Sequence, residues 1–247
     1  MKKETGFVKI VFEDESIIAV IKPSGLAAQS LRGFEPDMES ELKNYLSVKS
    51  KSVNPYLGIV HRLDKPVSGI MLFAKTKKAA AGLGAQMAGR EFKKKYSAAV
   101  YGKPDADLAV YEDYIKKESA SNISYICRQG TNAAKKAVMS YALKKSIIHR
   151  DIKLSLLDIE LFTGRHHQIR LQLSYHKLPI IGDRKYGITK SGIGGLKTNK
   201  VSKDIAELES FNTALICTGL AFKHPVSGKH MEFGCEPEGY IWSLFAF

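Results

Sequence analysis

The sequence predicts an α+β fold in which helices and loops flank a mixed, mostly antiparallel central sheet. Apolar segments of strand length dominate the chain, helical segments fall between them at irregular intervals, and no internal repeat is visible. A regular alternation of strand and helix would instead favour a parallel, doubly wound sheet. The 247 residues, 44% of them hydrophobic, are enough to build a proper core.

Runs of β-branched and aromatic residues mark the strands. They are bounded by turn residues, as where SIIAVIK meets Pro23-Ser24-Gly25 and where KLSLLDIELF meets Thr163-Gly164. In chain order these runs predict strands over residues 7–12, 16–22, 69–75, 95–101, 153–162, 213–222 and 228–233.

Periodic apolar residues and alanine-rich composition indicate three helices. The first covers residues 37–49, with Asp37 as a possible N-cap, and the second covers 77–90. The third covers about 165–176, with Thr163 as a plausible N-cap.

The charge balance favours a polyanionic partner. Lys and Arg total 38 against 25 Asp and Glu, which gives a net charge of +13. Nucleic acid is the first candidate for such a field and an anionic membrane the second, although charge can also serve solubility alone. Part of the charge falls in residues 189–204, which are rich in Gly, Ser, Thr and Lys and predict a flexible basic loop.

Cysteine usage and the N-terminus indicate a reducing, cytoplasmic setting. Cys127, Cys217 and Cys235 are odd in number and form no CxxC, which argues against a disulfide framework and a four-cysteine zinc site. His224 and His230 lie near Cys235, but the spacing matches no familiar metal motif. No signal peptide is expected, because no long apolar run follows the first two lysines, and no stretch is apolar for long enough to span a membrane.

Two polar clusters interrupt the strands in the first half of the chain. In the loop His61-Arg62-Leu63-Asp64, Asp64 can act as nucleophile or general base, and Arg62 can contact a phosphate or a base. Without further context, the favoured interpretation is that Asp64 caps backbone amides and pairs with Arg62. Tyr96, which begins a strand, can transfer a proton or stack on a base, or it can be an ordinary strand tyrosine.

A third cluster follows the strand that ends before Thr163. Arg165 at a helix start is unfavourable for the helix dipole, which suggests a carboxylate or phosphate partner. Arg170 lies four residues after His166 and extends the same helix face. His166 and His167 are adjacent and are expected to point in different directions, so a shared metal is not expected.

Composition and spacing alone leave three functions open. A basic protein with one loop carboxylate, a tyrosine and several arginines suits an RNA-modifying enzyme, and it also suits an RNA-binding protein without chemistry. A nucleoside glycosidase is the third possibility. Such enzymes usually use paired carboxylates, and Asp64 stands alone in a convincing site.

Two long blocks resemble the RluA-type family of RNA pseudouridine synthases. GIVHRLDKPVSGIMLFAK is similar to the family signature H-R-L-D, then S-G and an apolar strand, and TGRHHQIRLQLSYHKLPIIGDRKYG is similar to its second signature. VFEDESIIAVIKPSGL resembles the family's first strands and its Lys-Pro-x-Gly turn, and KKYSAAVYG resembles the segment that holds its tyrosine. The resemblance spans roughly residues 8–234, in the family's order.

The resemblance implies a fold, an activity and a substrate. The expected fold is the pseudouridine synthase catalytic fold, as a single domain over residues 1–247 without an N-terminal accessory RNA-binding domain. The expected reaction isomerises uridine to pseudouridine in structured tRNA or rRNA through base flipping, without a metal or other cofactor. The protein is expected to act as a monomer.

The resemblance also assigns the site residues. Asp64 is the expected catalytic aspartate, Arg165 its basic partner, and Tyr96 the residue that stacks on the base and is implicated in proton removal from C5. Expected substrate contacts come from Arg62, His61, Arg170, His167 and Lys22. His166 stands where the family often has Thr or Lys, which leaves substrate identity open.

Overall fold

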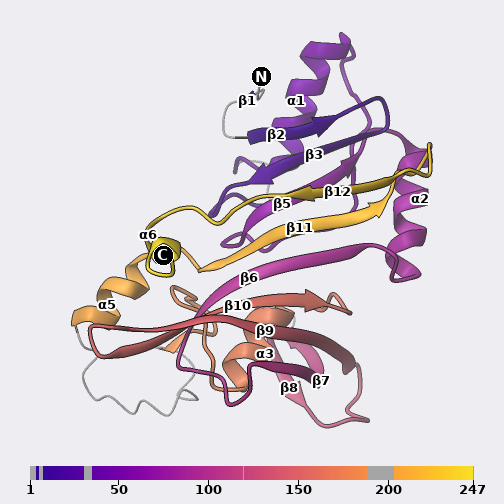
Figure 1. Ribbon diagram of the computed structural model, residues 1–247. Helices are drawn as coiled ribbons and strands as arrows, with labels where there is room; N and C mark the ends of the chain where they lie inside the picture. The colour runs from indigo at the N-terminus through magenta and orange to yellow at the C-terminus, as the bar shows by residue number, and fades with distance from the viewer. Residues whose placement is uncertain (1–3, 6–7, 31–34, 119, 189–202, 247) are drawn as a thin grey trace. The chain divides into compact units, whose positions relative to one another are not determined.

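The computed structural model is shown in Figure 1. The chain forms two compact units, and it passes from the first to the second within the strand that contains Lys94 and Lys95. Whether the two units together make the single domain expected from the sequence stays a prediction. The structure describes residues 4–5, 8–30, 35–118, 120–188 and 203–246.

The first unit comprises Met1–Lys94 and Ile216–Glu236 and is built on a mixed sheet. Its strand order is β1-β2-β3-β5-β11, with β4 paired to β5 and β12 paired to β11. These pairs are antiparallel except for β5 and β11, which run parallel. The strands are β1 (Glu4–Thr5), β2 (Val8–Glu13), β3 (Ile17–Lys22), β4 (Gly58–Ile59), β5 (Ser68–Ala74), β11 (Leu215–Lys223) and β12 (His230–Gly234).

A glycine allows the parallel contact between β5 and β11. Gly69 pairs with Cys217 and has a φ of +119°, which side-chain-bearing residues rarely adopt. A Cβ atom at position 69 would overlap the backbone of Cys217. The two strands can therefore meet only while residue 69 has no side chain.

Two capped helices belong to the first unit. The side chain of Asp37 accepts a hydrogen bond from Ser40 N at 2.9 Å and begins α1 (Met38–Ser50), so the predicted cap is confirmed. Thr76 caps α2 (Lys77–Ala88) in the same way. The apolar residues that these helices bury are Met38, Leu42, Leu46, Ala79 and Leu83.

The second unit comprises Lys95–Leu215 and Pro237–Phe247. Its sheet has the order β6-β10-β9-β7-β8, and every neighbouring pair that the register defines is antiparallel. The strands are β6 (Lys93–Tyr101), β7 (Leu108–Glu118), β8 (Ile123–Cys127), β9 (Lys135–His149) and β10 (Ile152–Leu161); the helices are α3 (Gln168–Tyr175), α5 (Lys203–Ser210) and α6 (Tyr240–Ser243).

Helix α3 lies against one face of the sheet of the second unit (Figure 1). Leu171 and Tyr186 form a buried cluster with Ile115 of β7 and Ala137 of β9, and Ile126 of β8 packs against it. Every residue of α3 before Tyr175 is buried, including its glutamines and its arginine. A helix buried on all sides must satisfy its polar side chains inside the protein.

The predicted fold class is confirmed, because the structure has mostly antiparallel strands with helices between them. The seven predicted strands are present, each within two residues of its expected ends. The basic loop predicted over 189–204 lies outside the described residues up to position 202, and Lys203 and Asp204 instead begin α5, which the sequence did not predict. Among the described residues, no helix is long and apolar enough to cross a membrane.

Candidate active site

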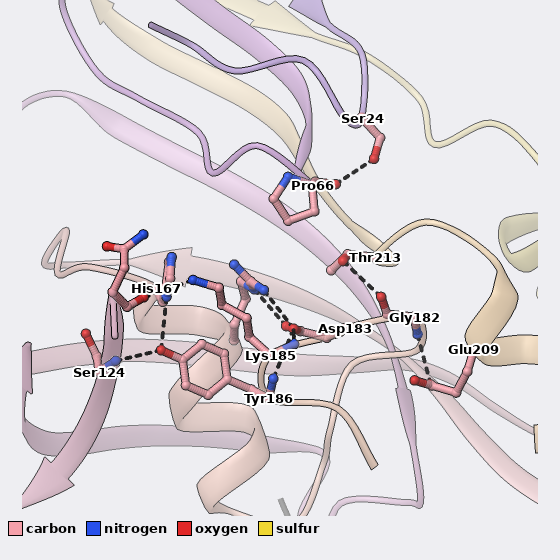
Figure 2. A network of polar contacts seen from close by, with 12 residues as sticks. Ser24, Pro66, Ser124, His167, Gly182, Asp183, Lys185, Tyr186, Glu209 and Thr213 are labelled. Atoms are coloured by element: carbon pink, nitrogen blue, oxygen red, sulfur yellow. Dashed lines mark hydrogen bonds and ion pairs between the residues drawn. The ribbon is translucent and has the colours of Figure 1, made fainter. Parts of the chain in front are cut away.

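Asp64 lies in the loop between β4 and β5 of the first unit. Val67 N donates to Asp64 O at 3.0 Å and closes a turn around it. The next two carbonyls are held as well, because Gly25 N donates to Lys65 O at 2.9 Å and Ser24 Oγ donates to Pro66 O at 2.7 Å (Figure 2). The loop is thus fastened at consecutive residues to the turn that ends β3.

The residues of this loop alternate between the interior and the surface. His61 and Leu63 are buried, whereas Arg62 is exposed and Asp64 is half-buried. The two buried side chains anchor the segment, while Arg62 reaches solvent and Asp64 is partly covered.

Lys22 holds the same loop from inside the first unit. Its side chain is fully buried, and Nζ donates to the carbonyl oxygens of Pro23, Leu26 and Lys65 at 2.9, 2.6 and 3.1 Å. An ammonium group has three donors, so these bonds account for all of them. Burial lowers the pKa of Lys22 to about 7, while the negative charge of Asp64 acts in the opposite direction.

His61 is buried beside β5. Its Nε2 accepts a hydrogen bond from Leu72 N at 3.3 Å, so a neutral ring carries its proton on Nδ1. Within the described ranges, that buried Nδ1 has no hydrogen-bond partner. Burial, with the charge of Lys94, lowers the pKa of His61 to about 3, which keeps the ring neutral at physiological pH.

Tyr96 and Arg165 belong to the second unit. Tyr96 lies in β6 opposite Ile159 of β10 and is 6% exposed. Arg165 lies in the connection from β10 to α3 and is half-buried. Its Nε donates to Lys136 O in β9 at 2.8 Å, and its backbone N donates to Gln168 Oε1 at 3.0 Å.

The helix after Arg165 begins later than predicted. Its first residue is Gln168, and the N-cap position is His167 in a left-handed conformation, with φ of 54° and no side-chain cap bond. Thr163 is not the N-cap, because its Oγ1 accepts from Val138 N and donates to Gln168 Oε1, both at 2.8 Å. Arg165 therefore precedes the helix, and the expected conflict with the helix dipole does not arise.

The two adjacent histidines also differ from expectation. Their ring centroids lie 3.7 Å apart at an interplanar angle of 30°, and the backbone at His167 is left-handed. His167 Nδ1 lies 2.9 Å from the hydroxyl of Tyr186, which also accepts from Ser124 N at 2.7 Å (Figure 2). His166 Nδ1 lies 2.9 Å from Ser124 Oγ. No group of three or more His, Cys, Asp or Glu in the described part of the chain is placed to hold a metal ion.

Arg170 forms a buried ion pair rather than extending a surface shared with His166. Its Nε and one terminal nitrogen each lie 2.7 Å from an oxygen of Asp183, and the two side chains are 3% and 0% exposed. Asp183 also accepts from the backbone N atoms of Lys185 and Tyr186. Burial raises the pKa of Asp183, but the bonds from Arg170 and the two amides outweigh this, and the net pKa is lowered.

The structure thus divides the predicted site residues between two units. Lys22, His61, Arg62 and Asp64 lie together in the first unit, where Lys22 and His61 support the loop from inside. The second unit holds Tyr96 and Arg165, with His167 and Arg170 in the buried network behind Arg165. The pairing of Asp64 with Arg165 and the substrate contacts of the other five residues stay predictions.

Sequence reasoning missed several residues that hold these loops. Ser24 and Gly25 were recognised only as turn residues, although their position directly after a strand was visible. Gln168, Gln172 and Asp113 gave no recognised signal, although two glutamines four residues apart in a helix share a face.

The chain is similar to known proteins over most of its length. A family model described as RNA pseudouridylate synthase matches residues 16–175. The chain is 32% identical over 241 residues to ribosomal large subunit pseudouridine synthase D of Zymomonas mobilis, covering 96% of this chain and 72% of that protein. It is 36% identical over 181 residues to ribosomal large subunit pseudouridine synthase C of Rickettsia bellii, covering 73% of this chain and 57% of that protein.

A solved structure has the same fold. The human protein RNA Pseudouridylate Synthase Domain Containing 4 superposes with a TM-score of 0.74 at 22% identity, covering 95% of this chain and 91% of that chain. The expected pseudouridine synthase fold is therefore confirmed.

Proposed function

Because the chain belongs to the RNA pseudouridylate synthase family, and is an isomerase that converts uridine in RNA to pseudouridine, we propose that Asp64 is its catalytic carboxylate. The observation that carries this proposal is the loop around Asp64. Three consecutive backbone carbonyls, beginning with that of Asp64 itself, accept hydrogen bonds within the first unit. A carboxylate that acts at one atom of its substrate needs such a fixed backbone.

The reaction explains the types of residue required. The N1–C1′ bond of uridine breaks, the uracil turns over, C5 bonds to C1′, C5 loses its proton, and N1 takes up a proton. Asp64 acts at the sugar as nucleophile, base or charge stabiliser. The atoms balance without an oxidant or reductant, so the chemistry requires no redox cofactor.

Arg165 and Tyr96 have the two supporting roles in this proposal. A carboxylate in a closed site stays ionised when a cation accompanies it, and Arg165 supplies that cation. The aromatic ring of Tyr96 retains the detached uracil and serves proton removal from C5. Flipping the target nucleotide out of its stack costs a few kcal/mol. Arg62, which is exposed beside Asp64, holds the nucleotide in the flipped-out conformation and so offsets this cost.

The substrate that we propose is large-subunit ribosomal RNA. The relatives from Zymomonas mobilis and Rickettsia bellii are named as ribosomal large subunit pseudouridine synthases. The net charge of +13 suits any structured RNA, and the sequence by itself favoured transfer RNA slightly over ribosomal RNA. We therefore distinguish the two RNAs by experiment.

The test measures release of tritium from RNA labelled at C5 of uracil, taken from a host that lacks the gene. Ribosomal RNA and transfer RNA are assayed as separate fractions with wild type, Asp64→Ala and the control Asp105→Ala, which removes an exposed carboxylate of the second unit. We expect wild type and Asp105→Ala to release tritium from ribosomal RNA. Asp64→Ala should release none while binding RNA with affinity within a few-fold of wild type.

Each other outcome has a defined meaning. Appreciable turnover by Asp64→Ala would refute the assignment of the catalytic carboxylate. Release from transfer RNA alone would replace the proposed substrate. Tight RNA binding by wild type without release from either fraction would favour an RNA-binding protein whose chemistry is vestigial.

A further inference from the structure

Two buried glutamines of α3 lie behind the loop that carries Arg165. Gln168 is 3% exposed and Gln172 is 0% exposed, and they stand one helical turn apart on the same face. A buried carboxamide is costly unless its donors and acceptor are satisfied. Both glutamines meet this requirement by bonding to each other and to residues on either side.

These bonds form a chain that begins at a carboxylate. Asp113 Oδ2 accepts from Gln172 Nε2 at 2.7 Å. Gln172 Oε1 accepts from Gln168 Nε2 at 3.0 Å. Gln168 Oε1 then accepts from the backbone N of Arg165 at 3.0 Å and from Thr163 Oγ1 at 2.8 Å.

The two ends fix the direction of every bond between them. An ionised carboxylate can only accept, and the backbone N–H of Arg165 can only donate. If the carboxamide of Gln172 were reversed, its oxygen would face the oxygen of Asp113. If that of Gln168 were reversed, its NH₂ group would face the N–H of Arg165. One orientation of each amide therefore satisfies the whole chain.

The carboxylate end of the chain is itself held. His176 Nε2 lies 3.1 Å from the same oxygen of Asp113, and the His176 ring stacks on Tyr111 at a centroid distance of 3.8 Å. Burial raises the pKa of Asp113, but the bonds to His176 and Gln172 outweigh this and lower it overall. Asp113 is thus ionised at neutral pH, as the chain requires.

We propose that Gln172 is a positioning residue for Arg165. It orients the carboxamide of Gln168, which holds the backbone of Arg165 in place, and Asp113 sets the polarity of the chain. Gln172 needs no contact with RNA for this role. The inference rests on the proposed function, because its effect on turnover depends on Arg165 taking part in the reaction.

The first variant is Gln172→Met, which keeps the length of the side chain and removes its hydrogen bonds. The matched control is Gln86→Met in the first unit, where the glutamine bonds both the N and the O of Lys223, at 2.8 and 2.7 Å. Two quantities are measured: kcat and KM for tritium release, and hydrogen exchange of the backbone amide of Arg165.

We expect Gln172→Met to lower kcat on the order of 10- to 100-fold with KM within a few-fold, because small displacements of catalytic groups have effects of that size. The amide of Arg165 should exchange faster than in wild type. Gln86→Met should leave both quantities unchanged. Faster exchange without a loss of kcat, a loss of kcat without faster exchange, or no change in either would each overturn the proposal.

Two further variants keep the test decisive. Arg165→Ala separates the two proposals: if it retains the kcat of wild type, the proposed role of Arg165 fails, whatever Gln172 does. If Gln172→Met does not fold, Asp113→Asn replaces it, since an asparagine oxygen can still accept from Gln172 while losing its charge. That variant should give a smaller loss of kcat and a smaller rise in exchange, and no change in either would overturn the inference.

Discussion

The loop that carries Asp64 and the loop that carries Arg165 are held in place by different kinds of contact. Around Asp64, the backbone carbonyls of the loop accept hydrogen bonds from the turn after β3 and from the buried amine of Lys22. Around Arg165, most of the anchoring comes from side chains, those of Thr163 and Gln168. The first loop is held through its own backbone carbonyls, and the second depends on the side chains of Thr163 and of a buried helix.

This difference has a consequence for substitution. A turn fixed by backbone bonds tolerates changes in most of its side chains, because backbone groups are common to all residues. A loop fixed by a chain of side-chain amides is sensitive to each member of that chain. We therefore expect single substitutions to disturb the surroundings of Arg165 more than those of Asp64.

The largest effect is expected from Arg170→Met, in the helix that follows the Arg165 loop. The variant leaves Asp183 buried without its cation, so the free energy of unfolding should fall by about 3–5 kcal/mol. Urea denaturation of wild type and variant measures this difference.

The matched control is Arg150→Met, whose partners Asp204 and Glu207 are exposed. Its effect on the free energy of unfolding should be much smaller, because solvent screens exposed ion pairs. Equal losses in the two variants would mean that the buried pair contributes no more than a surface pair.

Lys22→Met tests the Asp64 loop through the pH dependence of stability. Burial lowers the pKa of Lys22 to about 7 from its ordinary value of 10.5, so between these values the unfolded chain binds more protons than the folded chain. Wild type should therefore gain stability relative to Lys22→Met as pH rises through this window, by up to about 1.4 kcal/mol per pH unit. Below the window both states are protonated, and the difference should be flat.

Urea denaturation at a series of pH values follows this difference. Lys43→Met, which removes an exposed amine paired with Glu39 on α1, should show no such dependence. A flat difference for Lys22→Met as well would indicate that the three carbonyls keep the amine charged throughout the window.

The smallest expected losses of stability come from removing one hydroxyl group that holds each loop. Thr163→Val leaves the amide of Val138 without its acceptor and should cost about 1–3 kcal/mol of unfolding free energy. Ser24→Ala removes one bond to the carbonyl of Pro66 and should cost about 0.5–1.5 kcal/mol. Thermal or urea unfolding of both variants measures the two losses of unfolding free energy. A larger loss for Ser24→Ala than for Thr163→Val would contradict the expectation that the Arg165 loop is the more sensitive to substitution.

The features predicted well from the sequence are those set by neighbouring residues. Apolar runs placed the strands because side-chain burial along a strand depends on local pattern. Asp37 was predicted correctly as an N-cap because a cap bonds to an amide three residues away. The position of Asp64 on a loop between two strands follows from the same local information.

The features that the sequence did not reveal depend on tertiary contacts. Helix α3 begins at Gln168, directly after His167 with its left-handed backbone. His167 makes no side-chain cap bond, so no cap residue marks this start in the sequence. Thr163 bonds to Val138 of β9, a partner twenty-five residues away in sequence that local patterns do not identify. The series of hydrogen bonds from Asp113 to Arg165 likewise joins residues that meet only after β7, β9 and α3 have packed.

The parallel contact between β5 and β11 can form only late in the synthesis of the chain. The start of β5 meets its partner only at Ile216 and Cys217, after the segment Lys95–Leu215 of the second unit has been translated. At ordinary rates of translation the delay is on the order of ten seconds. During that interval the start of β5 is an open strand edge, the kind of surface that pairs with other chains. The nascent protein is therefore most prone to aggregate before residue 216 leaves the ribosome. The exposed edge is covered once Gly69 pairs with Cys217.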